Sequence, residues 1–153
     1  MTSSGKPPVA DVFSRWKTED RQLFTLIGEL RHWMSEVAQL GIPHFGETAT
    51  RLRPLRETLV QHFANEDEMI DQLTSQMSSA QITDQITDLY GRSSPGHQQL
   101  RDKLDGLIDR LNDLEPPFDS WQSAMAEVGE FFDDLEQHEK QESESVAGLI
   151  AAA

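Results

Sequence analysis

The chain has 153 residues, no cysteine, and 27 acidic against 13 basic residues, for a formal net charge of −14. This length suits one domain with its own core, and the lack of cysteine excludes disulfides, thiolate nucleophiles and cysteine-ligated metal or iron–sulfur sites. The acidic balance argues against nucleic acid and anionic membrane surfaces as partners, because phosphate binding requires clustered lysine and arginine. No apolar run approaches the ~20 residues of a transmembrane helix, so no membrane partner is expected.

The chain is predicted to form a single helical domain. Residues 1–9 contain two consecutive prolines and no apolar stretch typical of a secretory signal, so we expect a short flexible tail and, by default, a cytoplasmic protein. Residues 10–150 are expected to hold four amphipathic helices. No period-2 pattern or hairpin dipeptide indicates a strand.

The first two helices are bounded by glycine and proline. The first should run from about Ala10 to Leu40, because Gly41 and Pro43 follow it. The second should begin near Glu47, bend at Pro54 and fade at residues 75–79.

The last two helices complete the expected fold. The apolar ladder 82, 86, 89, 93, 97, 100, 104, 107, 111 keeps its phase across Pro95, which favours one long third helix kinked there. Asp119 and Gln122 resemble a capping box that opens a fourth helix reaching about Ile150. Four such helices with short to medium connections predict an all-α, up-down-up-down antiparallel four-helix bundle.

Two histidine–glutamate pairs interrupt the apolar stripes of this bundle. His62 and Glu66 fall on the ladder 55, 59, 62, 66, 69, 73, and His138 and Glu142 continue the stripe that contains position 135. Residues four apart share one face of a helix, so each imidazole and carboxylate can converge on one point. His97 lies on the ladder of the third helix. The remaining acidic residues of the run 136–144 are interpreted as the solvated face of the fourth helix.

The ordinary alternative is that each histidine is a core or boundary residue without a ligand. That alternative weakens with repetition, because burying two carboxylates without a compensating cation costs several kcal/mol each. Almost none of the 13 basic residues falls on the ladders. A bound divalent cation explains all five residues together, and carboxylates that can bridge allow two ions.

The motifs resemble those of a hemerythrin-like domain of the HHE cation-binding kind. The segment His62-Phe63-Ala64-Asn65-Glu66 is similar to the family's His-Phe-x-x-Glu signature, and His97 and then His138-x-x-x-Glu142 follow in the family's order. The resemblance spans about residues 12–148. It implies two non-haem irons bridged by Glu66 and Glu142, with His62 on one iron and His97 and His138 on the other.

The first helix departs from the family pattern, in which it supplies a further histidine. Its one histidine, His32, lies about 180° from the apolar stripe at about 100° per residue and should face solvent. Aligning the apolar run instead puts Asp20, or less favourably Glu19, in that place. A carboxylate at Asp20 could replace the imidazole, and an ordinary solvated acid is the equally weighted alternative.

The third helix has one histidine where oxygen-carrying members have two, so the predicted site is richer in oxygen donors. Such ligation favours iron or manganese and makes reversible oxygen carriage less expected, while zinc at a mononuclear site of the three histidines is a further possibility. The leading prediction is a di-iron protein that binds or reacts with O2, nitric oxide or peroxide, or senses iron or redox state. The alternative is a degenerate, metal-free bundle that serves as an interaction or regulatory module, and the sequence indicates no protein partner.

Overall fold

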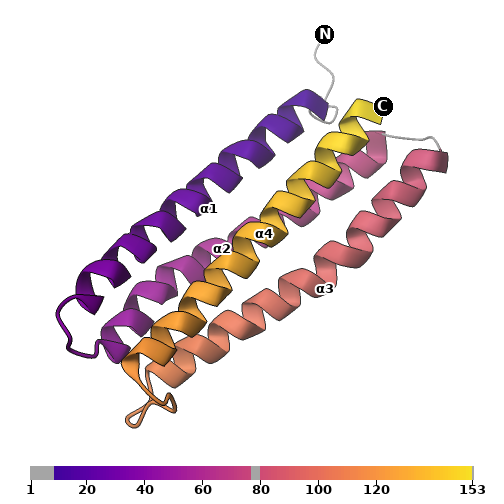
Figure 1. The fold of residues 1–153 in the computed structure, drawn as a ribbon. Helices are drawn as coiled ribbons and strands as arrows, with labels where there is room; N and C mark the ends of the chain where they lie inside the picture. The colour runs from indigo at the N-terminus through magenta and orange to yellow at the C-terminus, as the bar shows by residue number, and fades with distance from the viewer. Residues whose placement is uncertain (1–8, 77–79, 153) are drawn as a thin grey trace.

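The computed structural model describes the backbone of residues 9–76 and 80–152, with side-chain detail for residues 11–72 and 96–148. Within those ranges the chain is helical and contains no strand. The helices are α1 (Val9–Ala38), α2 (Phe45–Gln76), α3 (Ala80–Leu111) and α4 (Trp121–Ala152). They alternate in direction, and each packs against two others, with α1 closing the bundle against α4 (Figure 1). The predicted up-down-up-down four-helix bundle is confirmed.

The ends of the chain bear on two expectations. Residues 1–8 of the expected tail lie outside the described residues, and Val9, which was counted with the tail, already opens α1. Among the described helices, none combines the length and the apolar character needed to cross a bilayer.

A glycine with positive φ and a backbone hydrogen bond at the start of α2 shape the connection between α1 and α2. The N–H of Gly41 donates to the carbonyl of Ala38 at 3.4 Å, and Gly41 has a φ of 70°, which a residue without Cβ adopts without strain. The His44 carbonyl then accepts the Thr48 N–H at 3.0 Å, so α2 begins at Phe45, slightly before the predicted start. Pro54 lies inside α2.

The third and fourth helices show one prediction confirmed and one corrected. A single α3 runs through Pro95, as the phase of its apolar ladder predicted. The predicted capping box at Asp119 was wrong, because the Oγ of Ser120 accepts the N–H of Ser123 at 3.0 Å and α4 starts at Trp121. Asp119 and Ser120 are both residue types that suit a helix cap, and in the structure Ser120 takes that position.

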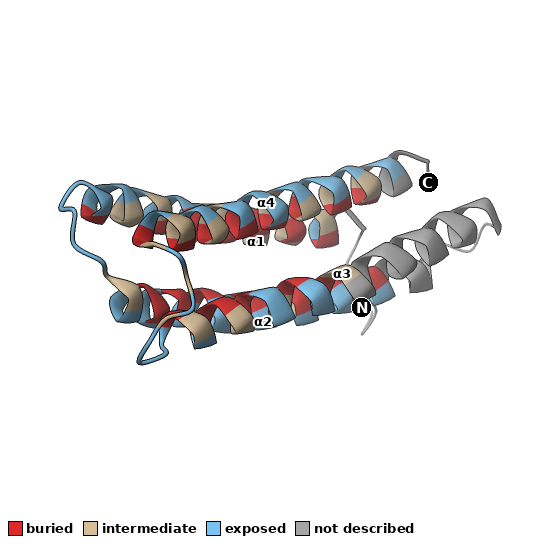
Figure 2. Cartoon of the chain, turned by 60° about the horizontal axis from the view of Figure 1, so that its bottom comes forward, coloured by how far each residue is buried: buried red, intermediate tan, exposed pale blue. Residues whose placement is uncertain are grey.

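The apolar core fills the bundle between the layer of predicted ligand residues, such as His62 and Glu142, and the end that carries the α1–α2 and α3–α4 connections. Buried positions face inward between the α1/α4 pair and the α2/α3 pair (Figure 2). Its largest fully buried members are Phe63, Phe131, Phe132, Leu23, Ile27, Leu52, Leu55 and Leu59. A second apolar set, Val12, Trp16, Met69, Ile70 and Val146, lies on the other side of the site along the helices. The polar layer between the two sets is therefore enclosed by apolar packing.

Candidate metal centre

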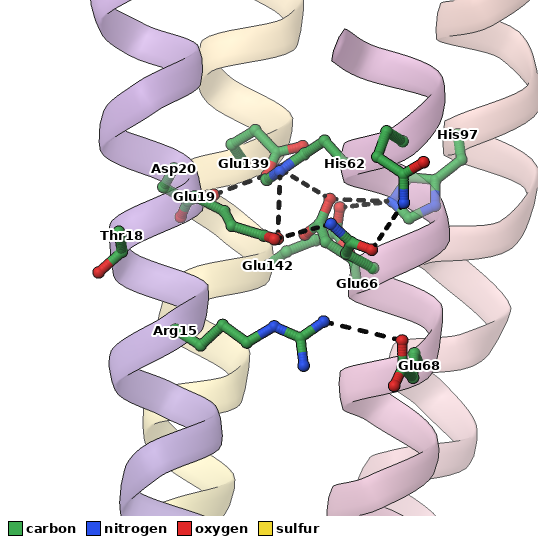
Figure 3. A network of polar contacts seen from close by, with 12 residues as sticks. Arg15, Thr18, Glu19, Asp20, His62, Glu66, Glu68, His97, Glu139 and Glu142 are labelled. Carbon is green, nitrogen blue, oxygen red and sulfur yellow. Dashed lines mark hydrogen bonds and ion pairs between the residues drawn. The ribbon is translucent and has the colours of Figure 1, made fainter. Parts of the chain in front are cut away.

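Two adjoining groups of side chains that could hold metal ions occupy this polar layer. The first contains Asp20, His62, Glu66 and Glu139, and the second contains His97, His138 and Glu142. Within each group, one ligand atom from every residue lies within 4.8 Å of those of the others. All four helices contribute, and the side chains of Asp20, His62, Glu66, His97, Glu139 and Glu142 converge in the space between them (Figure 3). The structure thus brings together all six residues predicted from the sequence and adds Glu139.

His62 is the centre of the first group. Its Nε2 lies 2.9 Å from Oε2 of Glu139, 3.0 Å from Oε1 of Glu66 and 3.5 Å from Oδ1 of Asp20. The four side chains come from α1, α2 and α4. Three carboxylates therefore lie close to one imidazole nitrogen. At these distances, a cation placed between the four side chains could be bound by all of them.

Glu142 is the centre of the second group. Its Oε1 lies 2.9 Å from Nε2 of His97 and forms an even closer ion pair with Nε2 of His138, one turn earlier in α4. The His97 ring stacks on Phe63 with ring centroids 3.9 Å apart and an interplanar angle of 7°. The His138 ring meets His97 edge to face at 5.1 Å. Aromatic packing thus holds both imidazoles with Nε2 facing the same carboxylate.

Glu66 connects the two groups. Its Oε1 lies 3.0 Å from Nε2 of His62 in the first group and 3.7 Å from Nε2 of His97 in the second. The side chain is fully buried, so its carboxylate is confined to this position. A carboxylate between two sets of nitrogen and oxygen donors has the placement that a bridging ligand requires.

The chemistry of the donor set fits a cation. Both carboxylate oxygens of Glu66, Oδ1 of Asp20 and Oε1 of Glu139 are buried and make no hydrogen bond with the described residues. No lysine or arginine of the described part of the chain pairs with Asp20, Glu66 or Glu139. Buried carboxylates are costly unless paired or bound to metal, so these residues fit divalent ions held by nitrogen and oxygen.

Without a cation, the carboxyl groups of Asp20 and Glu66 in the first group resist ionisation. Burial, the charge of Glu139 and a hydrogen bond to Glu139 raise the pKa of Asp20 from 3.8 to about 8. Burial and the charges of Glu139 and Glu142 raise the pKa of Glu66 well above its ordinary value. A bound cation removes this repulsion, so metal binding should release protons from the centre.

In the second group, the pKa of the carboxyl group shifts in the opposite direction. Burial alone would raise the pKa of Glu142, but hydrogen bonds and charges from His138 and His97 lower it to about 2. Burial alone would lower the pKa of His138, but its hydrogen bond to Glu142 and the charges of Glu142 and Glu139 raise it. The proton of His138 therefore compensates the Glu142 carboxylate in the metal-free state.

The first helix contributes a carboxylate to the centre. Asp20 is buried, with 7% of its surface exposed, and faces His62. This is the position expected if Asp20 takes the place of the family's first-helix histidine. Its neighbour Glu19 lies further out, with Oε2 3.8 Å from Nδ1 of His62 and Oε1 accepting a 2.7 Å hydrogen bond from Asn65. Glu19 therefore contacts the outer edge of the His62 ring, and Asp20 contacts the inner one.

Glu139 was missed by the sequence analysis. The expectation that it belongs to the solvated face of α4 was wrong, because Glu139 is fully buried and its Oε2 contacts His62. A signal was present in the spacing, since positions 135, 139, 142 and 146 also form a four-and-three ladder. In α4, both this ladder and His138 face the interior of the bundle, so a residue on either of the two neighbouring stripes can reach the centre.

The remaining histidines lie away from the centre. The side chain of His32 is 76% exposed and pairs with Glu36 on the surface of α1, as predicted. His44, to which no role was assigned, lies in the connection before α2, with Nδ1 3.3 Å from Oε2 of Glu47. Of the three histidines in the two groups, His62 is separated from His97 and His138, which does not favour a mononuclear three-histidine site.

Comparison with known proteins supports the resemblance of the motifs. No curated protein and no solved structure matches the chain. The family described as "Hemerythrin HHE cation binding domain" matches residues 11–150. That range includes every residue of both groups. The match spans nearly the whole bundle, and the protein therefore belongs to the hemerythrin HHE cation-binding family.

Proposed function

We propose that the protein binds two iron ions in this layer and uses them to bind, react with or respond to a small ligand such as O2, nitric oxide or peroxide. Family membership indicates cation binding in general, while the number and kind of ions and the ligand are part of the proposal. Asp20, His62, Glu66 and Glu139 would hold one ion, and His97, His138 and Glu142 would hold the other.

The observation that carries the proposal is the position of Glu66 between two adjoining ligand groups. Its Oε1 lies within 3.0 Å of one histidine nitrogen and 3.7 Å of another from the neighbouring group. A single carboxylate so placed couples the two positions, because its two oxygens can serve one ion each. Two bound irons would supply two-electron redox chemistry toward a diatomic ligand or peroxide.

The donor atoms indicate which ions are expected. Four carboxylates and three imidazoles form a set of oxygen and nitrogen donors without sulfur. Such donors suit iron and manganese, and imidazole also suits zinc, so competition among these ions is expected in vitro. The excess of carboxylates stabilises an oxidised metal pair, which supports redox reaction or sensing over reversible oxygen carriage.

Small ligands can approach the first group from the surface. A hollow of about 750 Å³ between α1 and α4 is lined by Asp20, Phe24, Glu136 and Lys140, among others. Another, of about 350 Å³ between α1 and α2, is lined by His62, Glu19 and Asn65, among others. Both hollows reach a residue of the centre, Asp20 in one and His62 in the other, so a ligand of a few atoms would approach the first position from either of them.

Elemental analysis of protein reconstituted anaerobically with Fe²⁺ tests the proposal, with ultraviolet–visible spectra taken before and after exposure to air. We expect two irons per chain and a charge-transfer absorption that changes on addition of O2, nitric oxide or peroxide. One iron per chain would reject the paired centre. No bound metal in a folded bundle would leave an interaction or regulatory role as the better proposal.

A further inference from the structure

Gly96 is an unusual residue for its place in the fold. It lies within α3, directly before His97, where a glycine weakens a helix and an alanine would strengthen it. Its backbone has no positive φ that would require glycine. The reason for a glycine must therefore be sought in the space around its Cα.

That space is taken by the ring of His138 from α4. A Cβ added at Gly96 would lie 2.6 Å from Cε1, 3.2 Å from Nδ1 and 3.7 Å from Nε2 of His138. The first distance is far below the separation of carbon atoms in van der Waals contact. The imidazole and a Cβ at position 96 cannot both occupy their places, so one of them has to move.

The His138 ring is held on its other sides by the centre itself. Its Nε2 pairs closely with Oε1 of Glu142, and its plane meets His97 at 70° and Phe63 at 74° with ring centroids 5.1 and 6.2 Å away. A displacement away from α3 therefore separates Nε2 of His138 from the other donors of the second group.

We infer that Gly96 is a positioning residue for the second metal position. Its missing side chain lets His138 lie flush against α3, with Nε2 facing the same point as Nε2 of His97 and Oε1 of Glu142. The part of this inference that concerns metal binding rests on the proposed two-ion function. The packing of His138 on Gly96 can also be tested in the metal-free protein.

The variant Gly96→Ala separates the two positions. The second position loses one of its three ligands, while Asp20, His62, Glu66 and Glu139 of the first position do not contact residue 96 in this way. We expect Fe²⁺ binding to fall from two ions per chain to one. The second ion should bind at least about tenfold more weakly than in the wild type.

Gly106→Ala is the matched control. Gly106 lies in the same helix, and a Cβ added there meets nothing within 4 Å. Both substitutions add one methyl group and raise helix propensity, so a difference between them reports the contact with His138 and not the backbone. Gly106→Ala should keep two ions per chain.

A double-mutant cycle with His138→Ala identifies the residue through which Gly96 acts. In the His138→Ala background the added methyl group meets no imidazole, so Gly96→Ala should have no further effect on binding of the remaining ion. Additional loss of metal in the double variant would mean that Gly96 acts through some other contact, and would overturn the inference.

A readout without metal keeps the test independent of the proposed function. The chain has five histidines, so the imidazole Cε1–H signals of the metal-free protein can be assigned by NMR with one substitution each. Gly96→Ala should shift the His138 signal strongly and the His32 signal not at all, and Gly106→Ala should shift neither. If the wild type binds no iron but Gly96→Ala shifts the His138 signal, the proposed function fails and the inference that His138 packs on Gly96 stands. An unmoved His138 signal with two retained ions would overturn the inference.

Discussion

The two ligand groups of the centre differ in chemistry although they share one layer of the bundle. The group around His62 has three carboxylates and one imidazole, while the group around Glu142 has two imidazoles and one carboxylate. In the metal-free state the first is short of positive charge, and the pKa of Asp20 rises to about 8. In the second, the proton of His138 compensates Glu142, and the pKa of Glu142 falls to about 2. An oxygen-rich position thus adjoins a nitrogen-rich one, so the two should differ in metal affinity and in their response to pH.

Removing one nitrogen from each group should have the largest effect. The double variant His62→Ala and His138→Ala leaves the first group with carboxylates alone and the second with one imidazole. We expect loss of both ions in elemental analysis, with helix content by circular dichroism unchanged, because the apolar core on either side is intact. Retention of two ions would show that these histidines do not ligate metal.

Removing one carboxylate should affect only the first group. Asp20→Asn keeps the shape of the side chain but removes the negative charge that faces His62. We expect one ion per chain at Fe²⁺ concentrations that give two in the wild type, with a loss of about 10- to 100-fold in affinity at the first position. Titration calorimetry that still resolved two wild-type binding events would make Asp20 an ordinary buried acid.

Asp20 of the first group and Glu142 of the second should respond to acidity in opposite ways in the metal-free protein. The pKa of Asp20 is 3.8 ordinarily and about 8 in the fold, so between these values the folded state retains a proton that the unfolded state releases. The free energy of unfolding should therefore fall as pH rises from about 4 to 8, by up to about 1.4 kcal/mol per pH unit for one such group. The raised pKa of Glu66 acts in the same direction. Glu142, with its lowered pKa, acts oppositely, and its stabilisation is lost as pH falls from about 4.5 toward 2.

Chemical denaturation of the metal-free protein at a series of pH values measures this dependence. Asp20→Asn should flatten the slope between pH 4 and 8, and saturating Fe²⁺ should reverse it because the ion replaces the protons. A metal-free protein whose stability rises from pH 5 to pH 8 would contradict the assigned protonation of the first group.

The smallest effect is expected at His32, which serves as the control for both groups. Its side chain is 76% exposed, and its contact is an ion pair with Glu36 one turn away. His32→Ala should change the free energy of unfolding by less than about 0.5 kcal/mol and leave two ions bound. Loss of an ion from this variant would overturn the placement of α1 in the bundle.

Much of the fold could be predicted because helix periodicity is a local property of the chain. The ladder through Leu55, Leu59, His62 and Glu66 faces inward as its spacing indicated, and α3 continues through Pro95 because its ladder keeps phase. Helix ends were placed less well, since Ser120 and Asp119 are both suitable caps and only the structure shows that Ser120 caps α4.

The sequence by itself determined four amphipathic helices and placed His62, Glu66, His97 and Glu142 on their buried faces, because residues three and four apart share one side of a helix. It also left Asp20 undecided and assigned Glu139 to solvent. Only the tertiary structure decided those two. Adjacent residues such as His138 and Glu139 differ by about 100° around a helix, and the rotation of α4 about its axis, set by packing against α1 and α3, brings both into the layer. The same packing brings His138 against Gly96, a contact between distant segments that no local pattern specifies.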